Sequence, residues 1–87
     1  VPDSAPEQIF LRALRLFDDG QAAAARPLLE EATRLRPTQS SWWLTLAATY
    51  AELREAELAK RAAQRALATA ANQTERDAAQ AQLARLP

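Results

Sequence analysis

The feature that most constrains this chain is a pattern of apolar and small side chains that recurs after 34 residues. The pairs related by that shift are Ile9 and Trp43, Ala13 and Ala47, Leu16 and Tyr50, Ala25 and Ala59, and Ala32 and Ala66. The first three members of each copy follow the helical spacing i, i+4 and i+7, which places them on one helix face. Two unrelated helices would not keep small residues in register over both halves of the chain, so the sequence predicts a tandem helical repeat.

The composition favours helices that pack at short distances. The 87 residues are enough for one small domain, and 48% of them are hydrophobic, many of these being alanine. One glycine, few β-branched residues and abundant alanine, leucine, arginine, glutamine and glutamate favour helix over strand. We therefore predict an all-α protein with closely packed helices.

The second copy of the pattern contains a specific motif. Trp43, Leu46, Ala47 and Tyr50 spell W-x2-L-A-x2-Y. This resembles the tetratricopeptide repeat, a helix–turn–helix unit of 34 residues with a W-x2-L-G-x2-Y pattern. The resemblance implies an α-solenoid of two antiparallel helix–turn–helix hairpins, in which each hairpin needs a neighbour to bury its apolar face.

The repeat period divides the chain into four segments. Residues 1–5 are predicted to form a linker or tail, 6–39 the first repeat, 40–73 the second repeat and 74–87 a C-terminal capping helix. The opening VPDSAP has two prolines and no apolar periodicity, which is typical of a linker leading in from a preceding segment.

The last segment predicts a fifth helix with a weaker pattern. Thr74 is the predicted N-cap, with Asp77 three residues later as part of a capping box. Continuing the repeat places Asp77 at the tryptophan position, which makes the segment a poor third repeat. Ala79, Leu83 and Leu86 form a thin apolar stripe suited to covering the second repeat. Because terminal helices of such arrays usually have a polar outer face, a cap is favoured over a truncated third repeat.

Other polar residues are assigned to turns, caps and surface pairs. Gly20 marks the turn of the first repeat, and Arg54 replaces it in the second. Glu30 and Glu31 are both predicted to pair with Arg34 on the surface of one helix. The other hydroxyls expected to accept hydrogen bonds at helix starts are those of Thr38, Ser40 and Ser41.

The sequence argues against catalysis and against bound metals. Histidine and cysteine are absent, which removes the commonest general base, nucleophile and metal ligands, and there is no glycine-rich phosphate loop. Eleven basic and eleven acidic residues cancel, whereas a surface that binds nucleic acid normally carries excess positive charge. We expect no enzyme activity, no cofactor, no metal and no nucleic-acid partner.

The two tryptophans are predicted to face different neighbours. If Trp43 points into the core, Trp42 lies about 100° around the helix. That direction places Trp42 toward the preceding repeat, near Leu28, so the aromatic residues are expected to hold the two repeats together. Stacking of Trp42 on a ligand is the alternative.

Another sector of each first helix supplies the candidate binding site, about 80–140° from the core direction. It holds Phe10, Leu14 and Phe17 in the first repeat, with Asp18 beside them, and Leu44, Ala48 and Ala51 in the second, with Thr45 and Glu52 at its far edge. By resemblance to the family, this sector lines the concave groove in which ligands bind. The basic clamp with which some relatives grip a C-terminal carboxylate would need Lys, Arg and Asn there, and this sequence lacks them.

Three uses of this mostly apolar row are open. It can bind an amphipathic helix or apolar peptide of another protein, join two copies of the chain, or be buried within the chain. Protein binding is the favoured interpretation, as an adaptor, a co-chaperone or an assembly module of a larger protein. Homo-oligomerisation through the same patch is the alternative.

The compartment is left open between cytoplasm and periplasm. No run approaches the roughly 18 apolar residues of a membrane span, and no signal-peptide pattern opens the chain. The chain begins at Val1 and not at methionine, so we expect a trimmed or processed product. The alanine- and arginine-rich, lysine-poor composition suggests a GC-rich bacterial genome.

Overall fold

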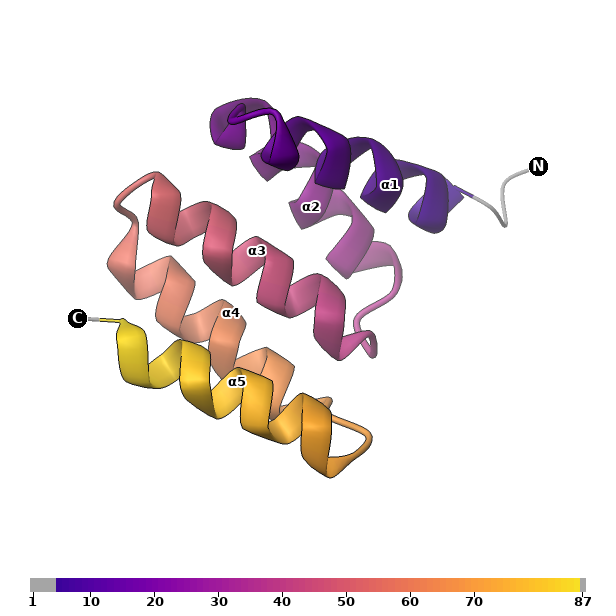
Figure 1. The fold of residues 1–87 in the computed structure, drawn as a ribbon. Coiled ribbons are helices and arrows are strands. Elements are labelled where there is room, and N and C mark those ends of the chain that lie inside the picture. Colours follow the sequence, from indigo (N-terminus) through magenta and orange to yellow (C-terminus); the bar gives the residue numbers. More distant parts are fainter. Residues whose placement is uncertain (1–4, 87) are drawn as a thin grey trace.

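The computed structural model describes residues 5–86, which fold into five helices joined by short turns. They are α1 (Ala5–Asp18), α2 (Ala22–Leu35), α3 (Ser40–Glu52), α4 (Ala56–Ala68) and α5 (Gln73–Arg85). α1 and α2 pack as one hairpin and α3 and α4 as a second, while α2 contacts α3 and α4 contacts α5. In Figure 1, α1, α3 and α5 lie side by side, and α2 and α4 pass behind them. This is the all-α arrangement of two hairpins and a fifth helix that the sequence predicts.

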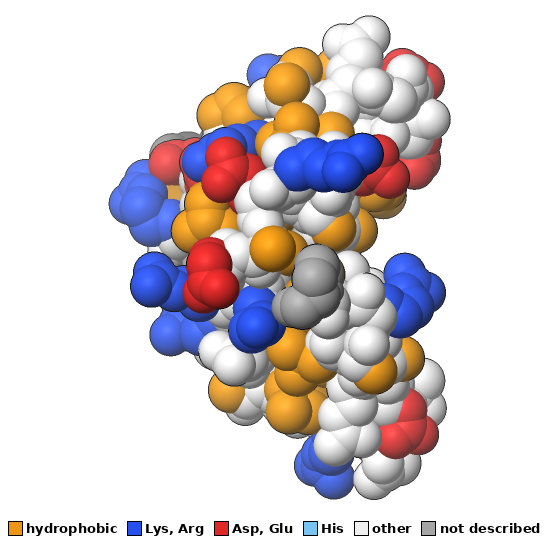
Figure 2. Space-filling view, turned by 90° about the vertical axis from the view of Figure 1, so that its left-hand side faces the viewer, with side chains coloured by type: hydrophobic (Ala, Val, Ile, Leu, Met, Phe, Trp, Pro, Cys, Tyr) orange, Lys and Arg blue, Asp and Glu red, His pale blue; other side chains and the backbone are white. Residues whose placement is uncertain are grey.

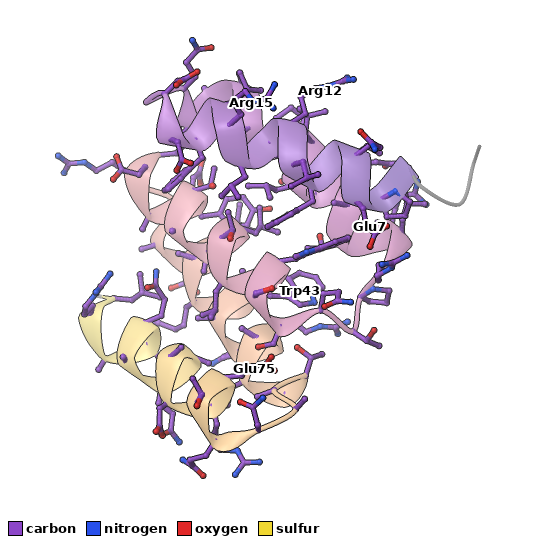
Figure 3. All side chains as sticks on the ribbon, turned by 45° about the vertical axis from the view of Figure 1, so that its right-hand side comes forward. Glu7, Arg12, Arg15, Trp43 and Glu75 are labelled. Atoms are coloured by element: carbon purple, nitrogen blue, oxygen red, sulfur yellow. The ribbon has the colours of Figure 1, made fainter. Side chains whose placement is uncertain are left out.

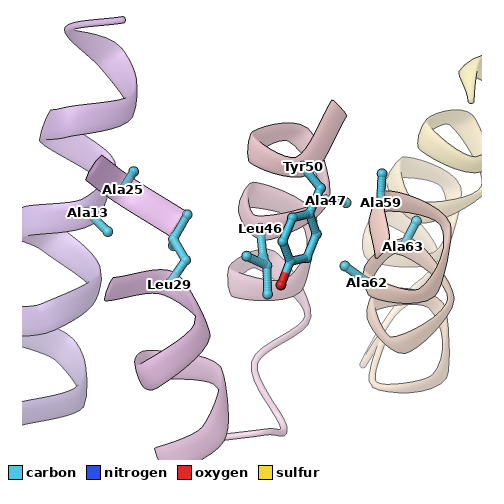
Figure 4. Close-up of a cluster of buried hydrophobic side chains, with 9 residues drawn as sticks. All are labelled: Ala13, Ala25, Leu29, Leu46, Ala47, Tyr50, Ala59, Ala62 and Ala63. Carbon is cyan, nitrogen blue, oxygen red and sulfur yellow. The ribbon is translucent and has the colours of Figure 1, made fainter. Parts of the chain in front are cut away.

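The core is built mainly from alanine. Its contiguous cluster, drawn in Figure 4, consists of Ala13, Ala25, Leu29, Leu46, Ala47, Tyr50, Ala59, Ala62 and Ala63. The repeat pattern contributes six alanines, all with 0% exposure: Ala13, Ala25, Ala32, Ala47, Ala59 and Ala66. Because the distance between two packed helices depends on the side chains at their contact, these short side chains permit the close approach. The recurring small residues therefore set the helix packing in both hairpins.

Both hairpins turn through one residue with a left-handed backbone. These residues are Gly20, with φ of +80°, and Arg54, with φ of +64°. At the first turn the N–H of Gln21 donates to the carbonyl of Leu16 at 2.8 Å, and the N–H of Gly20 donates to that of Phe17 at 3.0 Å. The same two hydrogen bonds close the second turn, at 2.9 and 3.1 Å. This is the Schellman motif, whose left-handed position glycine occupies without steric cost, so Arg54 carries a backbone strain that Gly20 does not.

The start of the chain and the start of α3 differ from the prediction. Residues 1–4 of the predicted tail lie outside the described range, and Ala5 already belongs to α1. Ser40 does begin α3, but its hydroxyl does not cap that helix. It donates to the carbonyl of Ala66 in α4 at 2.7 Å and is buried there. The serine thus fastens the two helices of the second hairpin to each other.

The N-cap of α5 is Asn72, so the prediction of Thr74 was wrong. The side-chain oxygen of Asn72 accepts a hydrogen bond from the N–H of Glu75 at 2.9 Å. The carboxylate of Glu75 accepts in turn from the N–H of Ala71 at 2.8 Å. This reciprocal arrangement resembles a capping box, with Glu75 in the role predicted for Asp77. α5 begins at Gln73, which places Thr74 inside its first turn.

Trp42 joins the two repeats. Its side chain is 7% exposed and stacks on Phe10 of α1, with ring centroids 4.8 Å apart and planes 10° apart. The guanidinium of Arg36, at the end of α2, lies 5.6 Å from the Trp42 ring centroid and 3.3 Å from the Glu7 carboxylate of α1. Trp42 therefore faces the preceding repeat as predicted, although the partner that the structure gives it is Phe10, where we expected a position near Leu28.

Trp43 lies at the edge of the core, on the face of α3 that also carries the core residues Leu46, Ala47 and Tyr50, as predicted. The side chain is half-buried and packs against the core cluster, near the start of α3 in Figure 3. Its indole N–H donates to the carbonyl of Pro37 at 2.8 Å, and the Arg65 guanidinium lies 5.1 Å from the ring centroid. Leu46 and Ala47, which are 2% and 0% exposed, lie deeper in the same core.

A buried phenol ties α2 to α3. Tyr50 is 6% exposed, and its hydroxyl donates to the Glu30 carboxylate. Arg26 donates to the same carboxylate at 3.2 Å and lies 5.3 Å from the centroid of the Tyr50 ring. Arg26 also reaches Glu55, just before α4, at 3.5 Å. The partners of Glu30 are therefore Arg26 and Tyr50, and not Arg34 as the sequence suggested.

Changing the two left-handed turn residues should shift stability in opposite directions. Arg54→Gly relieves about 1–2 kcal/mol of strain but loses about 0.4–1 kcal/mol because glycine is freer in the unfolded chain, so we expect a net gain of roughly 0.5–1 kcal/mol. Gly20→Ala should lose a similar amount through the backbone alone, since a Cβ there would meet no atom within 4 Å. Urea unfolding followed by circular dichroism measures both changes. Arg54→Ala keeps the strain, and an equal gain in that control would contradict the backbone explanation.

The single tyrosine gives a direct readout of the contact between α2 and α3. Burial, followed by the hydrogen bond to Glu30, raises the pKa of Tyr50 above its ordinary value of 10.0. As the pH rises, the unfolded chain therefore loses the Tyr50 hydroxyl proton before the folded chain does. The contribution of the neutral phenol to the stability of the folded chain is complete below pH 10.0 and declines as the pH rises above it. Tyrosinate absorbance should show a largely neutral phenol at pH 10.0 in the folded chain and half-ionisation near that pH in urea.

Glu30→Gln serves as the matched variant for this titration. It removes the charged acceptor but leaves the ring buried, so the Tyr50 pKa should fall only part of the way toward that of the unfolded chain. A Tyr50 that titrates in the folded wild type as it does in urea would show that the phenol is exposed to solvent.

Candidate functional site

The nine residues of the predicted groove lie on α1 and α3, and none of them is fully buried. The exposed members are Asp18, Ala51 and Glu52. The half-buried members are Phe10, Leu14, Phe17, Leu44, Thr45 and Ala48. α1 and α3 are in contact and run in the same direction in Figure 1. The row of predicted residues on α1 and the row on α3 therefore run alongside each other on a shared surface.

The two ends of this surface differ in what they bring together. At the starts of the helices, Phe10 is stacked on Trp42, which uses one face of its ring. At the ends of the helices, Phe17, Asp18 and Glu52 line one pocket of about 300 Å³. Ala51 is not part of that pocket and borders a different hollow, near α5. Members of the two rows are therefore brought together at the ends of the helices, by the pocket that Phe17, Asp18 and Glu52 line.

The middle of the surface is formed by Leu14 on α1 and by Leu44, Thr45 and Ala48 on α3. Among the described residues, the partly buried apolar side chains packed against the core cluster include Phe10 and Phe17 but neither of these two leucines. The Thr45 hydroxyl donates to the carbonyl of Ser41 within its own helix at 3.0 Å, so its hydrogen is already used. This part of the site is therefore apolar in character.

A second hollow, of about 410 Å³, lies between α2, α3 and α4 and was not predicted from the sequence. It is lined by Glu30, Thr33, Arg34, Pro37, Trp43, Leu46, Tyr50 and Arg65. Arg34 was predicted to pair on the surface of its own helix, because helix spacing shows only which residues share one helix face. Arg34 is held by Glu31, at 2.6 Å, and this hydrogen bond lowers the pKa of the Glu31 carboxyl. Helix spacing carries no signal for this hollow, because its lining comes from three different helices and from Pro37.

The described residues offer little for bound metals or membranes. Within residues 5–86, no three His, Cys, Asp or Glu side chains gather closely enough to hold a metal ion. No helix in that range has the length and apolar character needed to cross a membrane. The arrangement of the candidate site is instead one of apolar contacts with acidic groups at one end.

Comparison with known proteins agrees with the fold. The family model of the tetratricopeptide repeat matches residues 16–83, from the last turn of α1 into α5, which includes the contact between the two hairpins. No curated protein matches the chain closely enough to name a relative. Repeats of this family generally mediate interactions between proteins, and the family is typically not enzymatic. The resemblance inferred from the 34-residue pattern is therefore confirmed, and the chain belongs to the tetratricopeptide repeat family.

Proposed function

We propose that this chain binds a helix or an apolar peptide of another protein along the surface between α1 and α3, which we call the groove. The observation that carries the proposal is the position of Leu14 and Leu44. Both are partly exposed, and neither belongs to the apolar side chains packed against the core cluster. When a partner covers such leucines, binding becomes more favourable by about 25 cal/mol for each Å² of apolar surface removed from water.

The spacing of the groove suits a short helix. Phe10 and Phe17 are seven positions apart, which corresponds to about two helical turns or roughly 10 Å. On α3, the proposed groove includes the small side chains of Thr45 and Ala48, both half-buried, which occupy less space than a leucine would. An amphipathic helix that carries apolar residues at i, i+3 or i+4, and i+7 would place one side chain at each of these positions.

Replacing the two leucines should abolish partner binding without unfolding the domain. Each Leu→Glu change removes apolar contact and puts a charge into the interface, so Leu14→Glu/Leu44→Glu should weaken capture of the partner at least tenfold. The measurement is affinity capture from an extract of the source cells, with helicity checked by circular dichroism. Leu35→Glu is the matched control, because Leu35 is 42% exposed and lies on α2, outside the groove.

The outcomes separate this proposal from its alternatives. Loss of the same partner in Leu35→Glu, or equal capture by the wild type and the double variant, would move binding away from the groove. Light scattering at high protein concentration tests self-association through the same leucines. A wild type that forms dimers, with a monomeric Leu14→Glu/Leu44→Glu variant and no foreign partner, would replace the proposal by homo-oligomerisation.

A further inference from the structure

The end of the groove is a pocket with its own chemistry. Phe17, Asp18, Gly20, Ala22 and Glu52 line its volume of about 300 Å³. This is at the lower limit for small-molecule sites, so the pocket has room for one side chain and not for a large cofactor. Figure 2 looks at the end of the molecule where α1 and α3 terminate, and charged and apolar side chains alternate on it. The pocket shares three residues with the proposed groove, so a peptide in the groove would run into it.

Both charged residues that line the pocket are acidic. Among residues 5–86, neither Asp18 nor Glu52 takes part in an ion pair. Asp18 is the last residue of α1 and Glu52 the last residue of α3, so each carboxylate stands at the negative end of a helix dipole. An acidic residue there opposes helix stability, and α3 has no basic residue in its last turn to offset it. The two carboxylates and two helix ends make this pocket attractive to a cation.

Phe17 adds an aromatic wall to the same pocket. A guanidinium can stack on an aromatic face while it donates hydrogen bonds to carboxylates, and it is less strongly hydrated than an ammonium group. A pocket formed by one aromatic ring and two carboxylates therefore fits arginine better than it fits lysine. Leu14 lies three residues before Phe17 on α1, so the two apolar side chains are on the same side of that helix.

We propose that the partner in the groove carries an arginine, flanked by apolar residues, whose guanidinium enters the pocket between Asp18, Glu52 and Phe17. This inference rests on the proposed function, since it names the chemistry of the same partner. The apolar residues of the partner cover Leu14 and Leu44, and the arginine fixes the direction in which the peptide lies. The interaction weakens with added salt, because part of it is the attraction between exposed charges.

The test is selection of binders from a random peptide library displayed on phage, followed by measurement of the selected peptides by isothermal titration calorimetry. We expect peptides that contain arginine beside apolar residues. Asp18→Asn/Glu52→Gln should weaken their binding about tenfold, as loss of a charge-assisted pair does. Replacing the peptide arginine by glutamine should have the same effect on wild type and almost none on that variant. Glu57→Gln/Asp77→Asn is the control, because it removes two charges outside the pocket and should leave the affinity within about twofold.

Three other results would overturn the inference in distinguishable ways. Peptides that require Leu14 and Leu44 but lack a basic residue would remove the arginine pocket and leave the proposed function standing. Basic peptides weakened equally by the pocket variant and by the control would show a general charge effect and no pocket. Selection that yields no peptide sensitive to Leu14→Glu/Leu44→Glu would overturn both the pocket and the proposed function.

Discussion

The stack of Trp42 on Phe10 is the contact on which the rest of this small array depends. A hairpin whose helices meet through alanine buries little apolar area, and two repeats are fewer than the three usually needed for stability. A buried aromatic side chain removes roughly 150–250 Å² from water, several times what an alanine removes. Trp42 and Tyr50, both less than 10% exposed, lie on α3 and reach the first hairpin. The contact between the hairpins therefore carries a large share of the folding free energy.

This contact also shapes the proposed groove. The stack uses one face of the Phe10 ring, so only the other face is left for a partner in the proposed groove. The opposite end holds Asp18 and Glu52 at the ends of two helices, and the strained Arg54 lies in the turn that follows α3. Features that cost stability thus gather at one end of the array, and the aromatic contact lies at the other. That separation lets the acidic end remain open without loosening the packing.

The repeat pattern predicted the fold better than it predicted the contacts. A 34-residue period predicts two hairpins and the positions of their turns, because both hairpins must bury alanines at corresponding positions. It could not show how deeply each tryptophan is buried, since α3 carries apolar residues on nearly every side: Trp43 packs against the core cluster but stays half-buried, whereas Trp42 is buried between the repeats. Asn72 and Thr74 are both good N-caps only two residues apart, so sequence left the start of α5 open. The bond from Tyr50 to Glu30 joins different helices, which helix spacing does not reveal.

α5 occupies the place that the first helix of a third repeat would take, since it packs on α4 and α3. The positions that correspond to Trp43, Leu46, Ala47 and Tyr50 are Asp77, Gln80, Ala81 and Ala84, and all four are exposed. On its other side, Ala79 is 0% exposed and Leu83 packs against the core cluster. A further helix laid on the exposed side would have to remove the Asp77 carboxylate and the Gln80 amide from water without burying a bulky apolar side chain in return. That cost is the physical argument for interpreting α5 as a cap and against interpreting it as a truncated third repeat.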